Sequence, residues 1–397
     1  MSTEINATLL KSDINKGNKI VITTGMALFA MFFGAGNIVF PLFLGANSGQ
    51  NIIESALGFL LAGVGVPFLG LMATSLYQGD YHLFFNRLGK WPAFLMITFL
   101  MIIIGPLAAM PRTEATTFNA LLPFLPDFLK NNSIFSLCYC GIVFLLAYRE
   151  TKVVSILGLI LSPIKIVSFS ILVFLGLLFS EVPLESNYTS WQSFQLAIGH
   201  GYNTMDLLAT FFYCAVAFKA IEQTAHQYPT ANSTTMTIKA CILGALITGA
   251  VYIGFMIVAY THASALQGLK EEQMISAISY AVLGKLGGLF VCVAVSFACV
   301  ATALALAEVC SAYLYKEIFK ERLSKRNCLL IVIITTYLIS NLGFQGIMHF
   351  SMPILNVVYP ALIVLCIMNI LHKWKGIKMV KFPVLFTILA SAFISFL

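Results

Sequence analysis

Apolar residues form eleven long runs along the chain, separated by short polar segments. Most runs hold about 20 residues, the length that an α-helix needs to cross a hydrocarbon core of roughly 30 Å. We therefore predict an all-α polytopic membrane protein with about 11 transmembrane helices. Their predicted positions are 20–45, 51–77, 91–118, 133–148, 153–180, 194–221, 236–261, 286–315, 328–343, 351–371 and 380–397.

The first run is interrupted near its middle by the segment 32–37, which reads FFGAGN, and Pro41 follows. Each glycine inside a helix costs roughly 1 kcal/mol relative to alanine. In a bilayer the freed backbone groups find no water, so unwound backbone is tolerated only where it lines a polar site or is covered by protein. The break indicates a site for a small solute or cation at two half-helix ends. The alternative is a kink that allows close helix packing.

A second interruption, GHGYNTMD at 199–206, divides the sixth run. The two breaks lie five helices apart, and an odd number of crossings gives the second unit the opposite topology. We therefore predict a five-plus-five inverted repeat, with helices 1 and 6 broken at the midplane. The expected division is a cytoplasmic tail at 1–18, a ten-helix core at 19–371 with repeats at 19–180 and 194–371, and an additional C-terminal helix at 372–397.

Composition and charge agree with this topology. Hydrophobic residues make up 59% of the chain and charged residues 10%, against roughly 25% charged in soluble domains. Of the 23 Lys and Arg residues, 18 lie on the predicted inner side, three on the outer side and two within spans. The positive-inside rule then places the N-terminus in the cytoplasm. The net charge of +7 forms no aromatic-interleaved basic patch, so we expect no nucleic-acid partner.

Six ionisable residues fall inside predicted spans, where a charge costs about 2.5 to 3.5 kcal/mol and is a functional hypothesis by default. Arg112 either snorkels outward to pair with a carboxylate or belongs, with Glu114, to an outer gate. Asp206 either attracts an ammonium, a cation or a proton, or caps the second half-helix. The six residues are Glu54, Arg112, Glu114, Lys165, Asp206 and Glu308.

The eighth span carries small and hydroxyl residues at helical spacing between Ser296 and Ala303. This stripe favours close helix packing over a sodium site, although hydroxyl and carbonyl oxygens also suit a hard cation. Residues 264–284 predict an amphipathic helix lying on the outer face.

The chain has no P-loop, dinucleotide motif, metal-ligand spacing or clustered catalytic triad, so we expect neither an enzyme nor an ATP-driven pump.

Three separated motifs, MALFAMFFGAGNIVFP at 26–41, GPLAAMPRT at 105–113 and GYNTMD at 201–206, resemble the hallmark stretches of the bacterial branched-chain amino acid carriers (system II, or livcs family). That family is similar to the wider group of leucine-transporter-fold proteins. The resemblance implies import of leucine, isoleucine and valine by alternating access, coupled to sodium or protons. It also implies a multi-pass protein of the bacterial inner membrane, with no cofactor beyond the coupling ion and no obligate protein partner.

The resemblance also implies binding residues. Amides around Ala35, Gly36 and Asn37 would hold the substrate carboxylate, and carbonyls near Phe32 and in 201–204 would face its ammonium. The predicted substrate-binding set is Phe32, Phe33, Gly34, Ala35, Gly36, Asn37, Gly201, Tyr202, Asn203, Thr204 and Asp206. The sodium candidate uses Ala30, Phe33, Ala298, Ala301 and Thr302.

Two features depart from the family pattern. Ala301 and Thr302 offer one hydroxyl where the family often has two, and the twelfth span of many relatives is absent from these 397 residues. Two alternative functions remain at this stage. One is a proton-coupled permease of the same fold for another amino acid, and the other is a channel.

Overall fold

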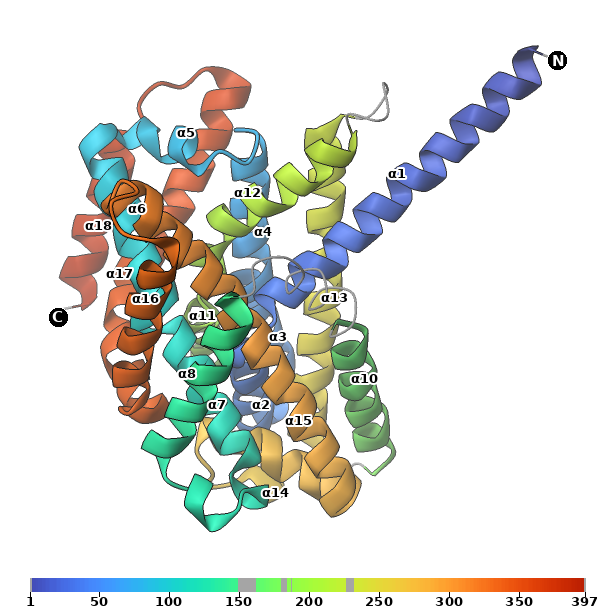
Figure 1. The fold of residues 1–397 in the computed structure, drawn as a ribbon. Coiled ribbons are helices and arrows are strands. Elements are labelled where there is room, and N and C mark those ends of the chain that lie inside the picture. The colour runs from blue at the N-terminus through green and yellow to red at the C-terminus, as the bar shows by residue number, and fades with distance from the viewer. Residues whose placement is uncertain (1, 149–161, 180–183, 187, 226–231, 396–397) are drawn as a thin grey trace.

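The computed structural model describes residues 2–148, 162–179, 184–186, 188–225 and 232–395. These residues form a helical bundle from which α1 extends outward toward the N-terminus (Figure 1). The helices are α1 (Ser2–Phe32), α2 (Ala35–Ser48), α3 (Ile52–Leu60), α4 (Val66–Ser75), α5 (Tyr81–Phe85), α6 (Lys90–Ile102), α7 (Ala109–Leu121), α8 (Asn132–Tyr148), α10 (Ser162–Leu178), α11 (Ser190–Asn203), α12 (Asp206–Ala225), α13 (Ser233–Thr261), α14 (Ala263–Leu266), α15 (Met274–Tyr313), α16 (Lys325–Ser340), α17 (Gly343–Lys375) and α18 (Lys381–Ser395).

Helices occur at all eleven predicted positions, although 153–161 of the fifth lies outside the described residues. By length and composition, five helical stretches of the described chain are able to cross a membrane, and the bent pair α11 and α12 makes a sixth. Shorter apolar helices such as Asn132–Tyr148 and Pro163–Leu178 accompany them. The prediction of an all-helical, multi-pass membrane protein is confirmed. Because α1 begins at Ser2, the polar stretch before residue 19 continues the first helix.

The predicted break in the first helix is present between α1 and α2. The last helical bond of α1 joins the Phe33 N–H to the Phe29 carbonyl at 2.9 Å. Gly34 is extended, with φ −123° and ψ −151°, and its N–H donates to Oδ1 of Asn37 at 3.2 Å. In an unbroken helix that N–H would bond to the carbonyl of Ala30. Asn37 therefore stabilises the break and frees the Ala30 carbonyl.

The predicted break in the sixth helix lies between α11 and α12, whose axes differ by 43°. Met205 adopts φ 63° there, a left-handed conformation that is uncommon for a residue with a side chain and concentrates at functional sites. The Thr204 hydroxyl donates to the Gly201 carbonyl at 2.9 Å, which satisfies one backbone group that the break exposes.

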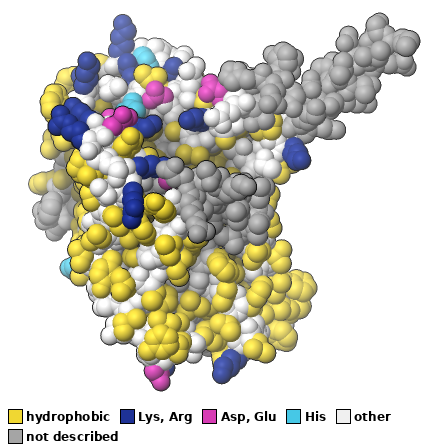
Figure 2. All heavy atoms as spheres, viewed as in Figure 1, with side chains coloured by type: hydrophobic (Ala, Val, Ile, Leu, Met, Phe, Trp, Pro, Cys, Tyr) yellow, Lys and Arg dark blue, Asp and Glu magenta, His cyan; other side chains and the backbone are white. Residues whose placement is uncertain are grey.

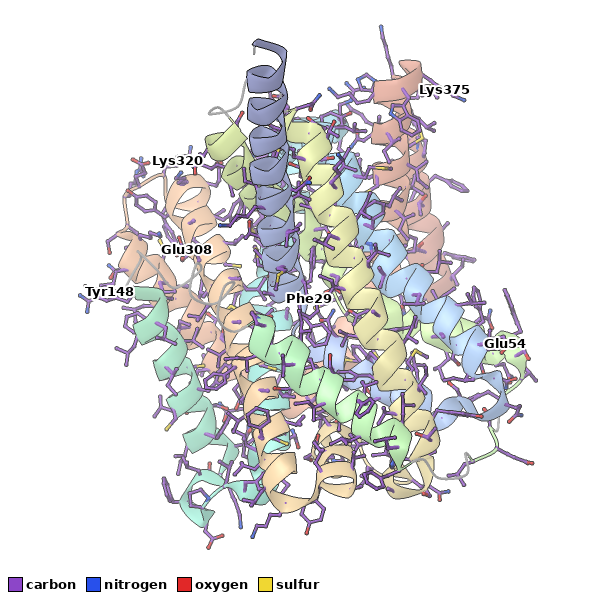
Figure 3. The ribbon with its side chains drawn as sticks, turned by 90° about the vertical axis from the view of Figure 1, so that its right-hand side faces the viewer. Phe29, Glu54, Tyr148, Glu308, Lys320 and Lys375 are labelled. Atoms are coloured by element: carbon purple, nitrogen blue, oxygen red, sulfur yellow. The ribbon has the colours of Figure 1, made fainter. Side chains whose placement is uncertain are left out.

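Close packing holds the two broken helices in the bundle. α1 and α2 pack on α13, α11 packs on α3, and α12 packs on α4. Gly45 permits the first of these contacts, because a Cβ at this position would lie 2.8 Å from the Cα of Met256. Figure 3 shows Phe29, at the last turns of α1, deep in the middle of the bundle, where its side chain is fully buried.

Within the predicted amphipathic segment 264–284, residues 274–284 form the start of α15, which has a kink at Gly284. Gly284 has φ 67°, which glycine adopts without steric cost. Met274, Ile275 and Ile278 of this segment are buried. It therefore rests its apolar side on the bundle, as a surface amphipathic helix does.

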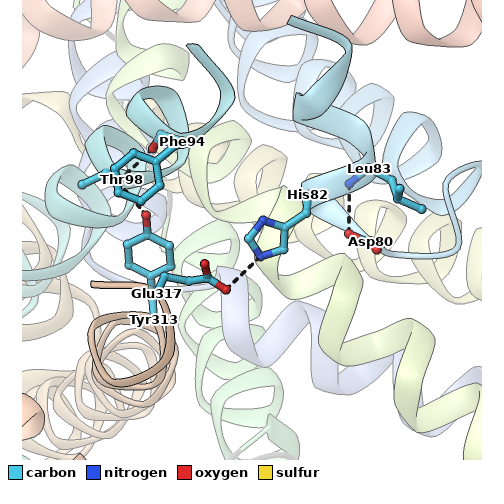
Figure 4. A network of polar contacts seen from close by, with 7 residues as sticks. All are labelled: Asp80, His82, Leu83, Phe94, Thr98, Tyr313 and Glu317. Carbon is cyan, nitrogen blue, oxygen red and sulfur yellow. Dashed lines mark hydrogen bonds and ion pairs between the residues drawn. The ribbon is translucent and has the colours of Figure 1, made fainter. Parts of the chain in front are cut away.

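Polar contacts cluster at the end of the bundle where α5 lies (Figure 4). Nε2 of His82 lies 3.5 Å from the Glu317 carboxylate, and the hydroxyls of Thr98 and Tyr313 are 2.5 Å apart. These contacts tie α6 to the last residue of α15, and α5 to the π-helical turn η9 (Leu314–Ile318) that follows it.

Glu54 and Glu308 were predicted to lie inside spans, and the structure places both near span ends. Glu54 stands in the first turn of α3 and is only partly buried. The Glu308 carboxylate pairs with Nζ of Lys325 at 2.7 Å, and the two side chains are 40% and 34% exposed. Each carboxylate thus avoids the desolvation cost that a mid-membrane position imposes.

We predict that Gly45→Ala lowers the free energy of unfolding by about 1 to 3 kcal/mol, because the added methyl group would overlap the Met256 backbone. Gly141→Ala in α8 is the matched control, since nothing lies within 4 Å of its Cβ position. Thermal unfolding of the purified proteins in detergent measures both. Equal melting temperatures for the two variants would contradict the close contact between α2 and α13.

Candidate functional site

A cavity lies between the two breaks and holds about 410 Å³ of space that protein atoms do not occupy, part of it open to solvent. Its walls come from α1, α2, α7, α12 and α15 and from the backbone of both breaks. The predicted site residues that line it are Phe32, Gly34, Ala35, Gly36, Asn37, Arg112, Thr204, Asp206 and Thr302.

Asn37 and Asp206 join the two breaks directly. The Asn37 amide nitrogen donates to Oδ2 of Asp206 at 2.6 Å and also to the hydroxyl of Tyr252. The Tyr252 hydroxyl in turn donates to the same carboxylate oxygen at 3.2 Å. Asn37, Asp206 and Tyr252 are 2%, 5% and 0% exposed, so the network lies in a low-dielectric interior where hydrogen bonds to a carboxylate are strong.

The alternative role predicted for Asp206 was a helix cap. Asp206 is the first residue of α12, and its carboxylate accepts bonds from α2 and α13 instead. The local backbone bond at this terminus uses Thr204, whose hydroxyl accepts from the Asp206 N–H at 3.4 Å. The carboxylate therefore connects helices across the site.

Arg112 does not snorkel outward. Its side chain is 2% exposed, and Nη2 donates to the Asn203 carbonyl in the second break at 2.6 Å. The guanidinium carbon lies 5.2 Å from the centre of the Phe40 ring and 5.5 Å from that of Phe344. These aromatic faces attract a cation, which is why Arg112 turns into the bundle. Among the described residues, its Nη1 has no hydrogen-bond partner.

Glu114 lies outside the cavity. The Ser136 hydroxyl of α8 donates to its Oε1 at 2.7 Å, and the nearby Tyr139 hydroxyl donates to Thr113 at 3.0 Å. Two helical positions separate Glu114 from Arg112, which turns the two side chains to different sides of α7. Glu114 thus ties α7 to α8.

Four other predicted residues support the cavity without lining it. Tyr202 stacks on Tyr359 with ring centres 4.6 Å apart, and Gly201 abuts Ala62, whose Cβ would lie 2.5 Å from an added Cβ. Asn203 provides the carbonyl that Arg112 binds. The ring of Phe33 packs 5.1 Å from that of Phe29.

Two residues of the sodium candidate are in direct contact. The Thr302 hydroxyl donates to the Phe33 carbonyl at 3.4 Å, and Ala298 and Ala301 are buried on the same helix, α15. The Ala30 carbonyl already accepts a bond from Nζ of Lys165 on α10 at 3.3 Å. The Lys165 ammonium is therefore bonded to the Ala30 carbonyl, which is one of the predicted ion ligands.

Sequence reasoning missed two tyrosines. Tyr252 completes the Asp206 network, and the Tyr359 hydroxyl accepts from the Leu207 N–H at 3.3 Å at the start of α12. A tyrosine hydroxyl in the middle of an apolar helix needs a polar partner. This requirement could have singled out both tyrosines in the sequence, but it does not identify the polar group that each one contacts.

Residues 17–397 match the family described as branched-chain amino acid transport protein. Branched-chain amino acid permease BraB of Bacillus subtilis is 32% identical over 361 residues, covering 89% of this chain and 80% of that protein. The branched-chain amino acid transport system 3 carrier protein of Pseudomonas aeruginosa is 28% identical over 380 residues, covering 93% and 85%.

Solved structures with the same fold include MhsT in complex with L-phenylalanine, with a TM-score of 0.60 and 17% identity over 94% of this chain and 98% of that one. Mhp1, a nucleobase-cation-symport-1 family transporter in a closed conformation with bromovinylhydantoin bound, has a TM-score of 0.62 and 14% identity over 94% and 91%. At these identities the likeness concerns the fold, which is that of the leucine transporter.

We predict that Tyr252→Phe lowers the free energy of unfolding by about 1.5 to 3 kcal/mol, because it removes a hydrogen bond to a buried carboxylate. Tyr213→Phe is the matched control. Tyr213 lines the same cavity, but its buried hydroxyl has no partner among the described residues, so its loss leaves stability unchanged or higher. Substrate-free melting temperatures distinguish the two, and equal losses would refute the network.

Proposed function

The chain belongs to the branched-chain amino acid transport protein family, and we propose that it imports leucine, isoleucine and valine by alternating access. It is a carrier with a secondary-transporter fold and not an enzyme. The proposal concerns the substrates, the direction of transport, the binding residues and the coupling to a sodium or proton gradient.

One observation supports the proposed site most directly: the cavity contains two opposite charges that do not pair with each other. Arg112 and Asp206 both line it, and no ion pair joins them in the described part of the chain. An amino acid zwitterion carries both complementary charges, an ammonium and a carboxylate, on its α-carbon. Binding it between these two side chains would compensate both buried charges, which are otherwise costly.

The carboxylate of the substrate would bind at the start of α2. The first N–H groups of a helix have no intrahelical acceptor and carry a partial positive charge, and Ala35 and Gly36 line the cavity at this position. Arg112 lies beside them, since its Nη2 would be 3.3 Å from a Cβ on Gly36. Its unpartnered Nη1 provides a further donor for the carboxylate.

The ammonium of the substrate would face Asp206 and the backbone of the second break at Thr204. Met31, Ile104, Ala109, Ala209 and Leu306 form an apolar wall of the same cavity, which suits a branched aliphatic side chain. A pocket of this kind separates substrates that differ by a methylene by only about 1 to 3 kcal/mol. We therefore propose that leucine, isoleucine and valine share the site.

The proposed transport cycle moves the broken helices against a scaffold made largely of the third, fourth, eighth and ninth spans, to which α7, α8, α15 and α16 belong. The repeats would be 19–180 and 194–371, with 1–18 as a cytoplasmic tail and 372–397 as a helix outside the core. Ala30, Phe33, Ala298, Ala301 and Thr302 are the candidate ligands if the coupling ion is sodium. Substrate and ion would each favour the same conformer, so each would tighten binding of the other.

We place this multi-pass protein in a bacterial inner membrane with the N-terminus in the cytoplasm. Bacterial relatives support the membrane. The orientation is supported by charge, because Lys and Arg side chains gather toward one end of the visible face (Figure 2), as at a cytoplasmic surface. The lipid bilayer and the amino acid are the partners that this function requires, without nucleic acid or another protein.

The function is tested by uptake of radiolabelled leucine into proteoliposomes with an inward sodium gradient, an inward proton gradient or neither. We expect leucine to accumulate above its external concentration under at least one gradient, because an ion-coupled carrier stores gradient energy as a concentration ratio. Empty liposomes are the control. Equilibration without accumulation would indicate a channel, and the absence of uptake by folded protein would refute the substrate assignment.

The site is tested with Arg112→Gln and Asp206→Asn, for which we expect leucine binding about ten- to a hundredfold weaker, since each removes one charge-assisted contact. Arg326→Gln is the control, because Arg326 contacts Tyr148 outside the cavity. 4-Methylpentanoate lacks the ammonium and isoamylamine lacks the carboxylate, so neither should compete strongly with leucine on the unmodified protein. Unchanged leucine affinity in both cavity variants would refute the assignment.

A further inference from the structure

Lys165 is a fully buried lysine that the proposed binding of the amino acid does not use. It lies in the apolar helix α10 and is 0% exposed, a position that a lysine occupies only when its charge has a partner. Within the described residues, no carboxylate forms an ion pair with it. Its hydrogen-bond acceptor is the Ala30 carbonyl at 3.3 Å.

The Ala30 carbonyl is free for this contact because of the break in the first helix. The Gly34 N–H, which would have bonded to it, is diverted to Asn37. The carbonyl therefore belongs to the C-terminal end of α1, where unpaired carbonyls carry a partial negative charge that favours a cation. Lys165 places its ammonium at this end.

Two of the candidate sodium ligands belong to the same helix end. Ala30 and Phe33 lie three positions apart, so their carbonyls occupy one side of the helix end, and the Thr302 hydroxyl reaches the Phe33 carbonyl at 3.4 Å. Lys165 lies on α10, which packs against α15, the helix that carries Ala298, Ala301 and Thr302. One buried region thus contains both the predicted ion ligands and the ammonium.

An ammonium and a sodium ion cannot share these ligands. A sodium ion bound to the Ala30 carbonyl would lie within a few ångströms of Nζ, and like charges at that separation repel strongly in a low-dielectric interior. The Lys165 ammonium already supplies the positive charge and the three hydrogen-bond donors that unpaired carbonyls require. α15 also supplies a single hydroxyl here, because alanine stands at position 301.

We propose that the Lys165 ammonium is the resident cation of this region and takes the place of a sodium ion, so that transport requires no sodium. Lys165 is a positioning residue: it holds the end of α1 against α10 and α15, the contact that a bound ion would otherwise make. The consequence of this inference for transport rests on the proposed function, the import of leucine. Of the two coupling ions proposed above, sodium and the proton, this inference excludes sodium and retains the proton.

The first measurement is binding of ²²Na⁺ to the purified protein without substrate, with unlabelled sodium or potassium as competitor. We expect no saturable, sodium-specific binding, and no rise in melting temperature when choline chloride is replaced by sodium chloride at constant ionic strength. Saturable binding or a sodium-specific rise would overturn the proposal. Because no amino acid is present, this result stands whether or not leucine is the substrate.

The second measurement is leucine uptake with sodium replaced by choline at constant pH. We expect uptake by the unmodified protein to change less than twofold. Lys165→Met should reduce uptake at least tenfold with or without sodium, and Lys165→Arg, which keeps the cation, should restore part of it.

Lys239→Met removes an exposed lysine of α13 and should transport normally. Size-exclusion profiles and melting temperatures establish that each variant is folded. Sodium-dependent uptake by the unmodified protein, or full uptake by Lys165→Met, would overturn the proposal. A lack of leucine uptake by the unmodified protein, with sodium binding absent, would refute only the substrate assignment.

Discussion

Backbone polar groups that a helix break exposes inside a membrane must find partners, because the bilayer offers no water. Four side chains meet this requirement here, in addition to Thr204 and Tyr359 described above. Asn37 accepts from the Gly34 N–H, Lys165 donates to the Ala30 carbonyl, Thr302 donates to the Phe33 carbonyl, and Arg112 donates to the Asn203 carbonyl. Three of these side chains come from helices outside the broken pair, so the breaks exist only as part of the assembled bundle.

Satisfying the breaks also builds the cavity. Arg112 binds the Asn203 carbonyl, and Asn37 binds both the Gly34 N–H and the Asp206 carboxylate. Both side chains also line the space between the breaks. Residues that stabilise the unwound segments therefore also line the cavity in which we propose that the zwitterion binds. A change at either position is expected to alter folding and transport together, which is why conservative variants and stability controls are needed to separate the two effects.

Much of the fold was predictable from local sequence. Apolar runs of membrane length predicted the helices, and the glycine-containing segments 32–37 and 199–206 predicted the breaks, because helix length and glycine's conformational cost depend on the chain itself. The second break falls at Thr204 and Met205, just beyond Gly201. The charges near the site were less predictable. Position inside an apolar span singled out six ionisable residues, but it did not predict their contacts. Glu114 bonds to Ser136 beyond the cavity, and Arg112 turns inward onto Phe40 and Phe344.

The sequence by itself determined that the chain is a multi-pass helical membrane protein with two interrupted helices, and its motifs pointed to the carrier family. Only the tertiary structure decided which side chains meet at the interruptions: Tyr252 with Asp206, Arg112 with Asn203, and Lys165 with Ala30. The physical reason is that hydropathy and glycine content act along the chain. Hydrogen bonds between residues 46, 91 and 135 positions apart depend instead on how each helix is rotated and placed by packing against its neighbours.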